Sequence, residues 1–139
     1  MLNTKSIEQF ETHIDGLYAF RVNEKITRED LRAIADVMND AFDVRDEVDM
    51  LISLKASDGA DFDATFDTEI IKANFRALTK VRNYCVAYAP GNAEKIMNLL
   101  SRVLPVEAKT FGSEHNALQH LRAQAKKREE DKSSDKKAA

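Results

Sequence analysis

Acidic and hydroxyl side chains gather near the middle of the chain, and their types and spacing come closest to those of a chemical site. Five oxygen-bearing residues alternate there like the early ligands of a calcium-binding EF-hand loop: Asp61, Asp63, Thr65, Asp67 and Glu69. The pattern then fails, because Phe66 stands where the loop needs glycine and Lys72 stands where it needs the bidentate glutamate. We therefore expect no metal and no other cofactor, and a solvated acidic loop is the simpler interpretation.

Histidine and cysteine offer little further chemistry. His115 and His120 are five residues apart, so a helix would place them on different faces, unlike the i, i+4 pairs of helical zinc sites. We expect both, and His13, to lie at the surface. Cys85, the single cysteine, falls in an apolar run where a thiol behaves as a small hydrophobe. One cysteine cannot form an internal disulfide, which fits a reducing cytoplasm.

Composition narrows the class of protein. The 139 residues suit one domain, and the net charge of -3 argues against nucleic acid as the main partner. No apolar stretch reaches the roughly 20 residues of a membrane span, and no signal peptide is recognised. The sequence also lacks a Walker loop, a G-x-G-x-x-G motif and a G-x-S-x-G motif. We expect a soluble, cytoplasmic protein without a nucleotide-binding or hydrolase signature.

Hydrophobic periodicity predicts the elements that would position these residues. Strands are expected at 7–14, 17–22, 48–54, 84–89 and 106–110. Helices are expected after the capping box Thr27–Asp30, over 65–79, after Asn92 and after Ser113. Strands separated by helices favour an α/β fold. Its five-stranded sheet would be mostly parallel, with an antiparallel N-terminal hairpin and about four helices.

The third expected helix and the C-terminus raise two further points. Ile96, Met97 and Leu100 could line an apolar cleft or a dimer face, although ordinary core is the commoner role of such a helix face. The domain is expected to occupy residues 1–124. Residues 125–139 form a charged segment that is too polar to bury a core, so we expect a frayed helix end followed by a disordered tail.

Four segments carry a family resemblance: LYAFRVNEKITREDLRAI (17–34), MLISLK (50–55), NFRALTKVRNYCVAYAPGNAEKIMNLL (74–100) and VEAKTF (106–111). Together they resemble the SpoIIAA-like proteins of the STAS superfamily, over about residues 6–123. The resemblance implies a domain that binds something and does not transform it. Its partner would be a protein, a second copy of the chain or a small apolar, lipid-like ligand.

Two alternatives remain beside that reading. Anti-sigma-factor antagonists of this superfamily carry a phosphorylated hydroxyl in an Asp-Ser-Ser-Gly motif, and the resemblance places Thr65 at the acceptor and Asp63 at the acid. Phe66 replaces the glycine, and a plain helix cap by either residue explains the same pattern. The other alternative is an enzyme that uses Asp58, Asp61 or Asp63. In the binding reading, Ser57, Asp58 and Asp61 form a binding loop at the carboxyl end of a central strand.

Overall fold

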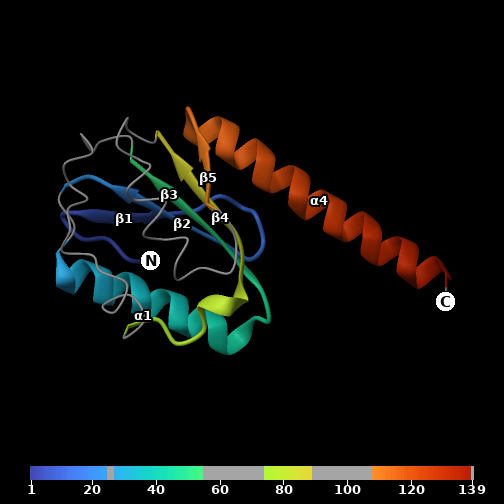
Figure 1. Cartoon of the computed structure of the whole chain (residues 1–139), viewed down its shortest axis with the longest axis horizontal. Coiled ribbons are helices and arrows are strands. Elements are labelled where there is room, and N and C mark those ends of the chain that lie inside the picture. The colour runs from blue at the N-terminus through green and yellow to red at the C-terminus, as the bar shows by residue number, and fades with distance from the viewer. Residues whose placement is uncertain (25–26, 55–73, 89–107, 139) are drawn as a thin grey trace.

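A five-stranded sheet forms the centre of the structure, a computed structural model that describes residues 1–24, 27–54, 74–88 and 108–138 (Figure 1). The strands are β1 (Ile7–Phe10), β2 (Leu17–Val22), β3 (Val48–Ser53), β4 (Val81–Ala87) and β5 (Ala108–Phe111), and they lie in that order across the sheet. β1 pairs with β2 antiparallel, and all other neighbours are parallel. The α/β class, the mixed sheet and the N-terminal hairpin are therefore confirmed.

The first strand is shorter than predicted, and the loop after it explains why. β1 ends at Phe10 and not at residue 14. The Glu11 carboxylate accepts hydrogen bonds from the backbone amides of Thr12 and His13, which turns the chain out of the sheet. His13 adopts a left-handed conformation with φ of 59°, and Gly16 follows with φ of 79°.

Residues 2–4 fold back along the outer edge of β1. The Gln9 amide donates to the Leu2 carbonyl at 2.8 Å, and the Thr4 amide donates to the Ile7 carbonyl at 2.7 Å. The Gln9 side chain accepts a further bond from the Leu2 amide at 2.9 Å. Backbone groups on that edge of the sheet are thus partly paired within the chain.

One face of the sheet is covered by α1 (Arg28–Val44). The helix begins with the predicted capping box, because the Thr27 hydroxyl accepts from the Asp30 amide while the Asp30 carboxylate accepts from the Thr27 amide. Its apolar side chains recur at helical spacing and enter the main core: Leu31, Ile34, Ala35, Met38, Ala41 and Phe42. The sheet residues facing them include Phe20 and Ile52.

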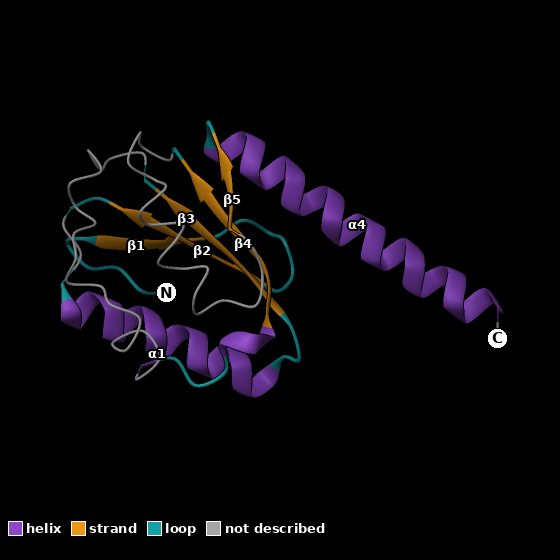
Figure 2. Ribbon diagram, viewed as in Figure 1, coloured by secondary structure: helices purple, strands orange, loops and turns teal. Residues whose placement is uncertain are grey.

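The other face is covered by α4 (Glu114–Ala138), which runs beyond the sheet (Figure 2). Ser113 caps it as predicted, since its hydroxyl accepts from the Asn116 amide at 3.1 Å. Ala117 and Leu121 are buried against the sheet. The structure continues the helix through the segment expected to be a frayed helix end and a disordered tail, and Arg128 in that segment contacts the sheet. The domain boundary at residue 124 stays a prediction.

The expected count of four helices is not supported. The described ranges hold two α-helices and one 3₁₀ turn, η1 (Leu78–Lys80). The other expected helices lie mostly outside these ranges, but residues 75–77 are not helical. The Asn39 side chain holds that stretch by donating to the Asn74 carbonyl and accepting from the Arg76 amide, each at 2.9 Å. β4 consequently begins at Val81, three residues before its predicted start. Within the described ranges, no helix has the length and apolar character needed to span a membrane.

Candidate functional site

The carboxyl ends of β2 and β3 carry a compact polar cluster. Arg21 and Ser53 are direct neighbours in the parallel register, and Glu114 is the first residue of α4. The Arg21 guanidinium donates to both oxygens of the Glu114 carboxylate, at 2.8 and 3.0 Å. The Ser53 hydroxyl, which is fully buried, donates to the same carboxylate at 2.8 Å. The cluster therefore joins two strands to the helix on the second face.

Arg21 is also constrained from the opposite side. Its guanidinium lies 4.0 Å from the centre of the Phe10 ring, a cation–π contact, and 3.7 Å from the Glu8 carboxylate. The hydrogen bond to Glu114 raises the pKa of Arg21 above its ordinary value. A two-pronged arginine–carboxylate pair of this kind has a well-defined geometry. This arrangement suits fixing the edge of the sheet better than donating or accepting a catalytic proton.

The ends of β4 and β5 complete the same edge. Tyr88 follows β4 directly and has a left-handed φ of 58°, which is uncommon for a bulky side chain. Its amide donates to the Phe111 carbonyl at 2.9 Å, and the Leu54 amide donates to the Ala87 carbonyl at 3.0 Å. A left-handed backbone in a non-glycine residue is strained, and such strain is concentrated at functional sites. These two hydrogen bonds fix the backbone of the residues that directly follow β3 and β4.

A second polar cluster lies at the amino ends of the strands and is centred on Asp49, which is completely buried. Arg82 donates to its two oxygens at 3.2 and 3.0 Å, and Asn83 donates at 2.9 Å. From α4, Arg128 adds a fourth hydrogen bond at 3.2 Å. Arg82 also reaches Glu47 at 3.1 Å. The net result is one buried carboxylate shared by two cations, as a buried charge requires.

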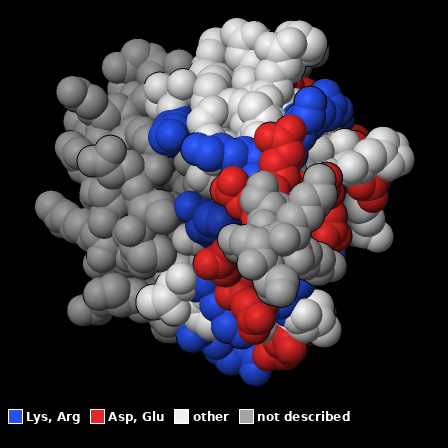
Figure 3. Space-filling model, turned by 90° about the vertical axis from the view of Figure 1, so that its right-hand side faces the viewer, with Lys and Arg blue, Asp and Glu red and all other residues white. Residues whose placement is uncertain are grey.

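An irregular register allows this convergence. Val48 pairs with Val81, whereas Asp49 pairs with Asn83, so Arg82 is the extra residue of a bulge between β3 and β4. The extra residue lets two consecutive side chains of β4 reach the same carboxylate. Figure 3 shows the side of the molecule toward which α4 projects, where basic and acidic side chains intermix.

Two titratable side chains lie between these clusters. Cys85 is 1% exposed, as expected for an inert thiol, and burial raises its pKa to about 12. His120 is only partly exposed, and no group in the described part of the chain bonds to its buried Nε2 atom. Burial lowers its pKa, and its ring lies 5.3 Å from that of Phe111. His13 and His115 are exposed as predicted.

The residues singled out from the sequence fall outside the described ranges. They are the helix-cap or phosphoacceptor pair Asp63 and Thr65, the loop residues Ser57, Asp58 and Asp61, and the apolar residues Ile96, Met97 and Leu100. Their roles stay predictions. Among the described residues, no cluster of histidine, cysteine and carboxylate side chains could hold a metal ion.

Sequence reasoning missed both polar clusters, although one signal was present. The predicted strand Val48–Leu54 is mostly apolar, yet it contains Asp49 and Ser53. A carboxylate in a strand covered on both faces requires a cation, and Arg82 stands two residues before the predicted start of the next strand. Arg128 and Glu114 lie far away in the sequence, so no local pattern could assign them to these partners.

Comparison with known proteins supplies the family. Neither a curated protein nor a solved structure matches the chain. The family model described as SpoIIAA-like matches residues 17–122, from the first residue of β2 into α4. The matched range includes both polar clusters except Arg128, and it agrees with the resemblance to the STAS superfamily. The chain therefore belongs to the SpoIIAA-like family.

Proposed function

We propose that this chain is a non-catalytic binding module that contacts a protein partner at the carboxyl edge of its sheet. The observation that carries the proposal is the cluster of Arg21, Ser53 and Glu114, whose polar groups satisfy one another at that edge. Ligands of open α/β sheets bind outside the carboxyl ends of the strands. Because the charged groups at this edge are paired with one another, they are better suited to hold a recognition loop in place than to take part in acid–base chemistry.

The candidate loop follows directly from this edge. Ser57, Asp58 and Asp61 come four to eight residues after Ser53, the last residue of β3. Because this loop carries carboxylates, the complementary surface of the partner is expected to be basic. A cytoplasmic location belongs to the same proposal and is supported by the reduced, buried Cys85.

Binding assays on the full chain test the proposal. A double variant, Asp58→Asn with Asp61→Asn, removes two charges from the candidate loop. The matched control removes two exposed charges from α1 instead, through Asp36→Asn with Asp40→Asn. We expect an affinity-purified partner to be retained by the parent chain and by the control, and to be lost from the loop variant. Equal retention by all three chains would contradict the role of the loop.

Native mass spectrometry separates this proposal from the ligand alternative. The purified chain is weighed under native conditions and again after denaturing extraction. An extra mass that disappears on denaturation would identify a small ligand, with Ile96, Met97 and Leu100 as its expected lining, and would contradict a purely protein-binding role. A doubled mass would show that the partner is a second copy.

Membership of the family favours one second candidate, a phosphorylation-controlled antagonist that acts through Thr65. A phosphate there would add about two negative charges beside several carboxylates. Thr65→Glu should then abolish partner binding, while Thr65→Ala should retain it. If both variants bind as the parent does, Thr65 serves only as part of the chain's local structure.

A further inference from the structure

α4 is attached to the sheet at two points, which lie near opposite ends of the strands. At its N-terminal end, Glu114 binds Arg21 of β2 and Ser53 of β3. Fourteen residues later, Arg128 donates to Asp49 near the amino end of β3. The helix runs antiparallel to the parallel strands and continues past them (Figure 1).

Release of these two attachments has unequal consequences. If Arg128 moves away, Asp49 keeps three hydrogen bonds, because Arg82 and Asn83 belong to the sheet itself. If Glu114 moves away, the fully buried Ser53 hydroxyl loses the acceptor to which it donates. An unpaired buried polar group is costly, whereas a buried carboxylate that stays paired is tolerated. The C-terminal attachment is therefore the easier one to open.

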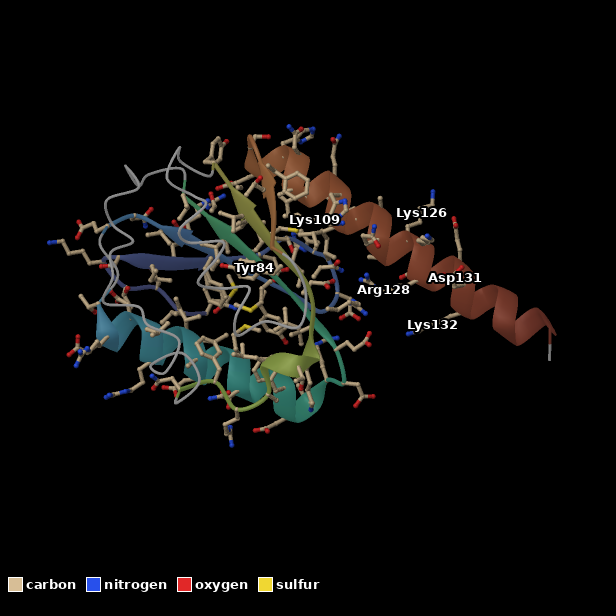
Figure 4. The ribbon with its side chains drawn as sticks, viewed as in Figure 1. Tyr84, Lys109, Lys126, Arg128, Asp131 and Lys132 are labelled. Atoms are coloured by element: carbon tan, nitrogen blue, oxygen red, sulfur yellow. The ribbon has the colours of Figure 1, made fainter. Side chains whose placement is uncertain are left out.

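Among the side chains of α4 that the structure describes, up to residue 132, those that pack against the apolar cluster lie in the first half of the helix. Ala117 and Leu121 are fully buried, and Leu118 and Ala125 pack partly against the same cluster. Residues 126–132 are all charged. Figure 4 shows Arg128 on the side of α4 nearer the sheet, while Lys126 and Asp131 point away from it. Arg128 is three-quarters buried, and it is the residue of this stretch that reaches a buried carboxylate.

We propose that α4 is a hinged arm, fixed at Glu114, anchored as far as Ala125, and latched in its second half by the ion pair between Arg128 and Asp49. Opening the latch frees the charged stretch 126–132 from the sheet and leaves the rest of the helix docked. The arm can therefore change position without exposure of the apolar face beneath its first half.

Hydrogen exchange on the full chain tests the latch. We expect Arg128→Gln to accelerate exchange of the amides of residues 126–132 about tenfold, as loss of one hydrogen bond to a charged group implies. Arg122→Gln, an exposed arginine on the same helix, is the matched control and should change nothing. Unchanged exchange in Arg128→Gln would overturn the latch. Faster exchange that includes β3 and β4 would overturn it too, because Arg128 would then support the core.

Cys85 tests the hinge, since it is the chain's single cysteine and lies under the first half of α4. A maleimide should label it in Arg128→Gln as slowly as in the parent. Glu114→Gln weakens the fixed end and should accelerate labelling. Faster labelling of Arg128→Gln would mean that α4 leaves as a whole, and unchanged labelling of Glu114→Gln would mean that Glu114 does not fix the helix. Either result overturns the hinge.

Discussion

The two faces of the sheet are held by different forces. Toward α1, the strands present large apolar side chains that interlock with the helix: Phe20, Val22, Met50, Ile52, Tyr84 and Val86. Toward α4, the buried side chains of the same strands are mostly smaller, with larger ones such as Phe10, Leu17 and Phe111 only partly buried; the buried ones are Ala19, Leu51, Cys85 and Ala87. Alternation along each strand assigns the residues to the two faces. Burial of apolar area fixes α1, whereas α4 depends more on charge and on a few small contacts.

This difference shows how one sheet can hold one helix firmly through a large apolar interface and a second helix through contacts that are easier to change. A large apolar interface responds to any loss of volume, because neighbouring atoms cannot fill the cavity. The stability of an interface of small side chains and ion pairs depends instead on the charges of its paired groups, which change by mutation or by proton uptake.

The largest effect is expected on the α1 face. Phe20 is completely buried in the main core. Phe20→Ala should lower the free energy of unfolding by about 4 kcal/mol, through lost transfer energy and a residual cavity. Urea unfolding followed by circular dichroism measures the change. A loss below about 1 kcal/mol would show that the main core does not lie on this face.

The buried carboxylate should come next. Asp49→Asn leaves Arg82 and Arg128 without their shared anion and is expected to lower the free energy of unfolding by about 3 kcal/mol. Glu47→Gln is the control, because it removes the exposed partner of the same Arg82 and should change stability by less than about 0.5 kcal/mol. Equal effects of the two variants would show that burial does not distinguish these carboxylates.

A smaller effect is expected for the apolar contact of α4. Leu121 is completely buried, in a cluster whose other fully buried members are mostly small, among them Ala19, Ala87 and Ala117. Leu121→Ala should therefore cost about 2 kcal/mol, at the low end for such a change. Thermal or urea unfolding measures this value beside Phe20→Ala. A larger loss than that of Phe20→Ala would reverse the ranking of the two faces.

The smallest effect concerns pH. Burial lowers the pKa of His120 in the folded chain below 6.5, its ordinary value, so folding favours the neutral ring. The contribution of the neutral His120 ring to the free energy of unfolding is complete above pH 6.5. It is lost as the pH falls from 6.5 through the pKa of His120 in the folded chain. Lys109 opposes protonation, while Asp49 favours it. Stability measured between pH 7.5 and 5 should fall less steeply in His120→Gln. The exposed control His115→Gln should keep the parent's slope.

Local patterns predicted much of the fold. The capping box at Thr27 and the strand Leu17–Val22 were predicted from neighbouring residues alone, because their signals are local. The early start of β4 was missed because Arg82 and Asn83 look like loop residues until their pairing with Asp49 is known. That pairing joins residues more than thirty positions apart. The contact of Arg128 with Asp49 was missed for the same reason, since the two residues are distant in the sequence.

The candidate site was predicted less well than the fold. Sequence reasoning placed interest on Asp58, Asp61 and Thr65, which lie outside the described residues. The described edge is instead organised by Arg21 and Glu114, which are 93 residues apart. The two sets of residues have one thing in common, which is that each was considered because ligands bind at the carboxyl ends of parallel strands.

The return of residues 2–4 along β1 bears on self-association. An uncovered strand edge invites pairing with another chain and is a common start of aggregation. Here the Leu2 carbonyl and the Thr4 amide form hydrogen bonds with backbone groups of β1 that a strand of another chain could otherwise bind. A bulky fusion placed immediately before Leu2 would displace this cover. A purification tag is therefore better attached beyond α4, where the helix already projects away from the sheet.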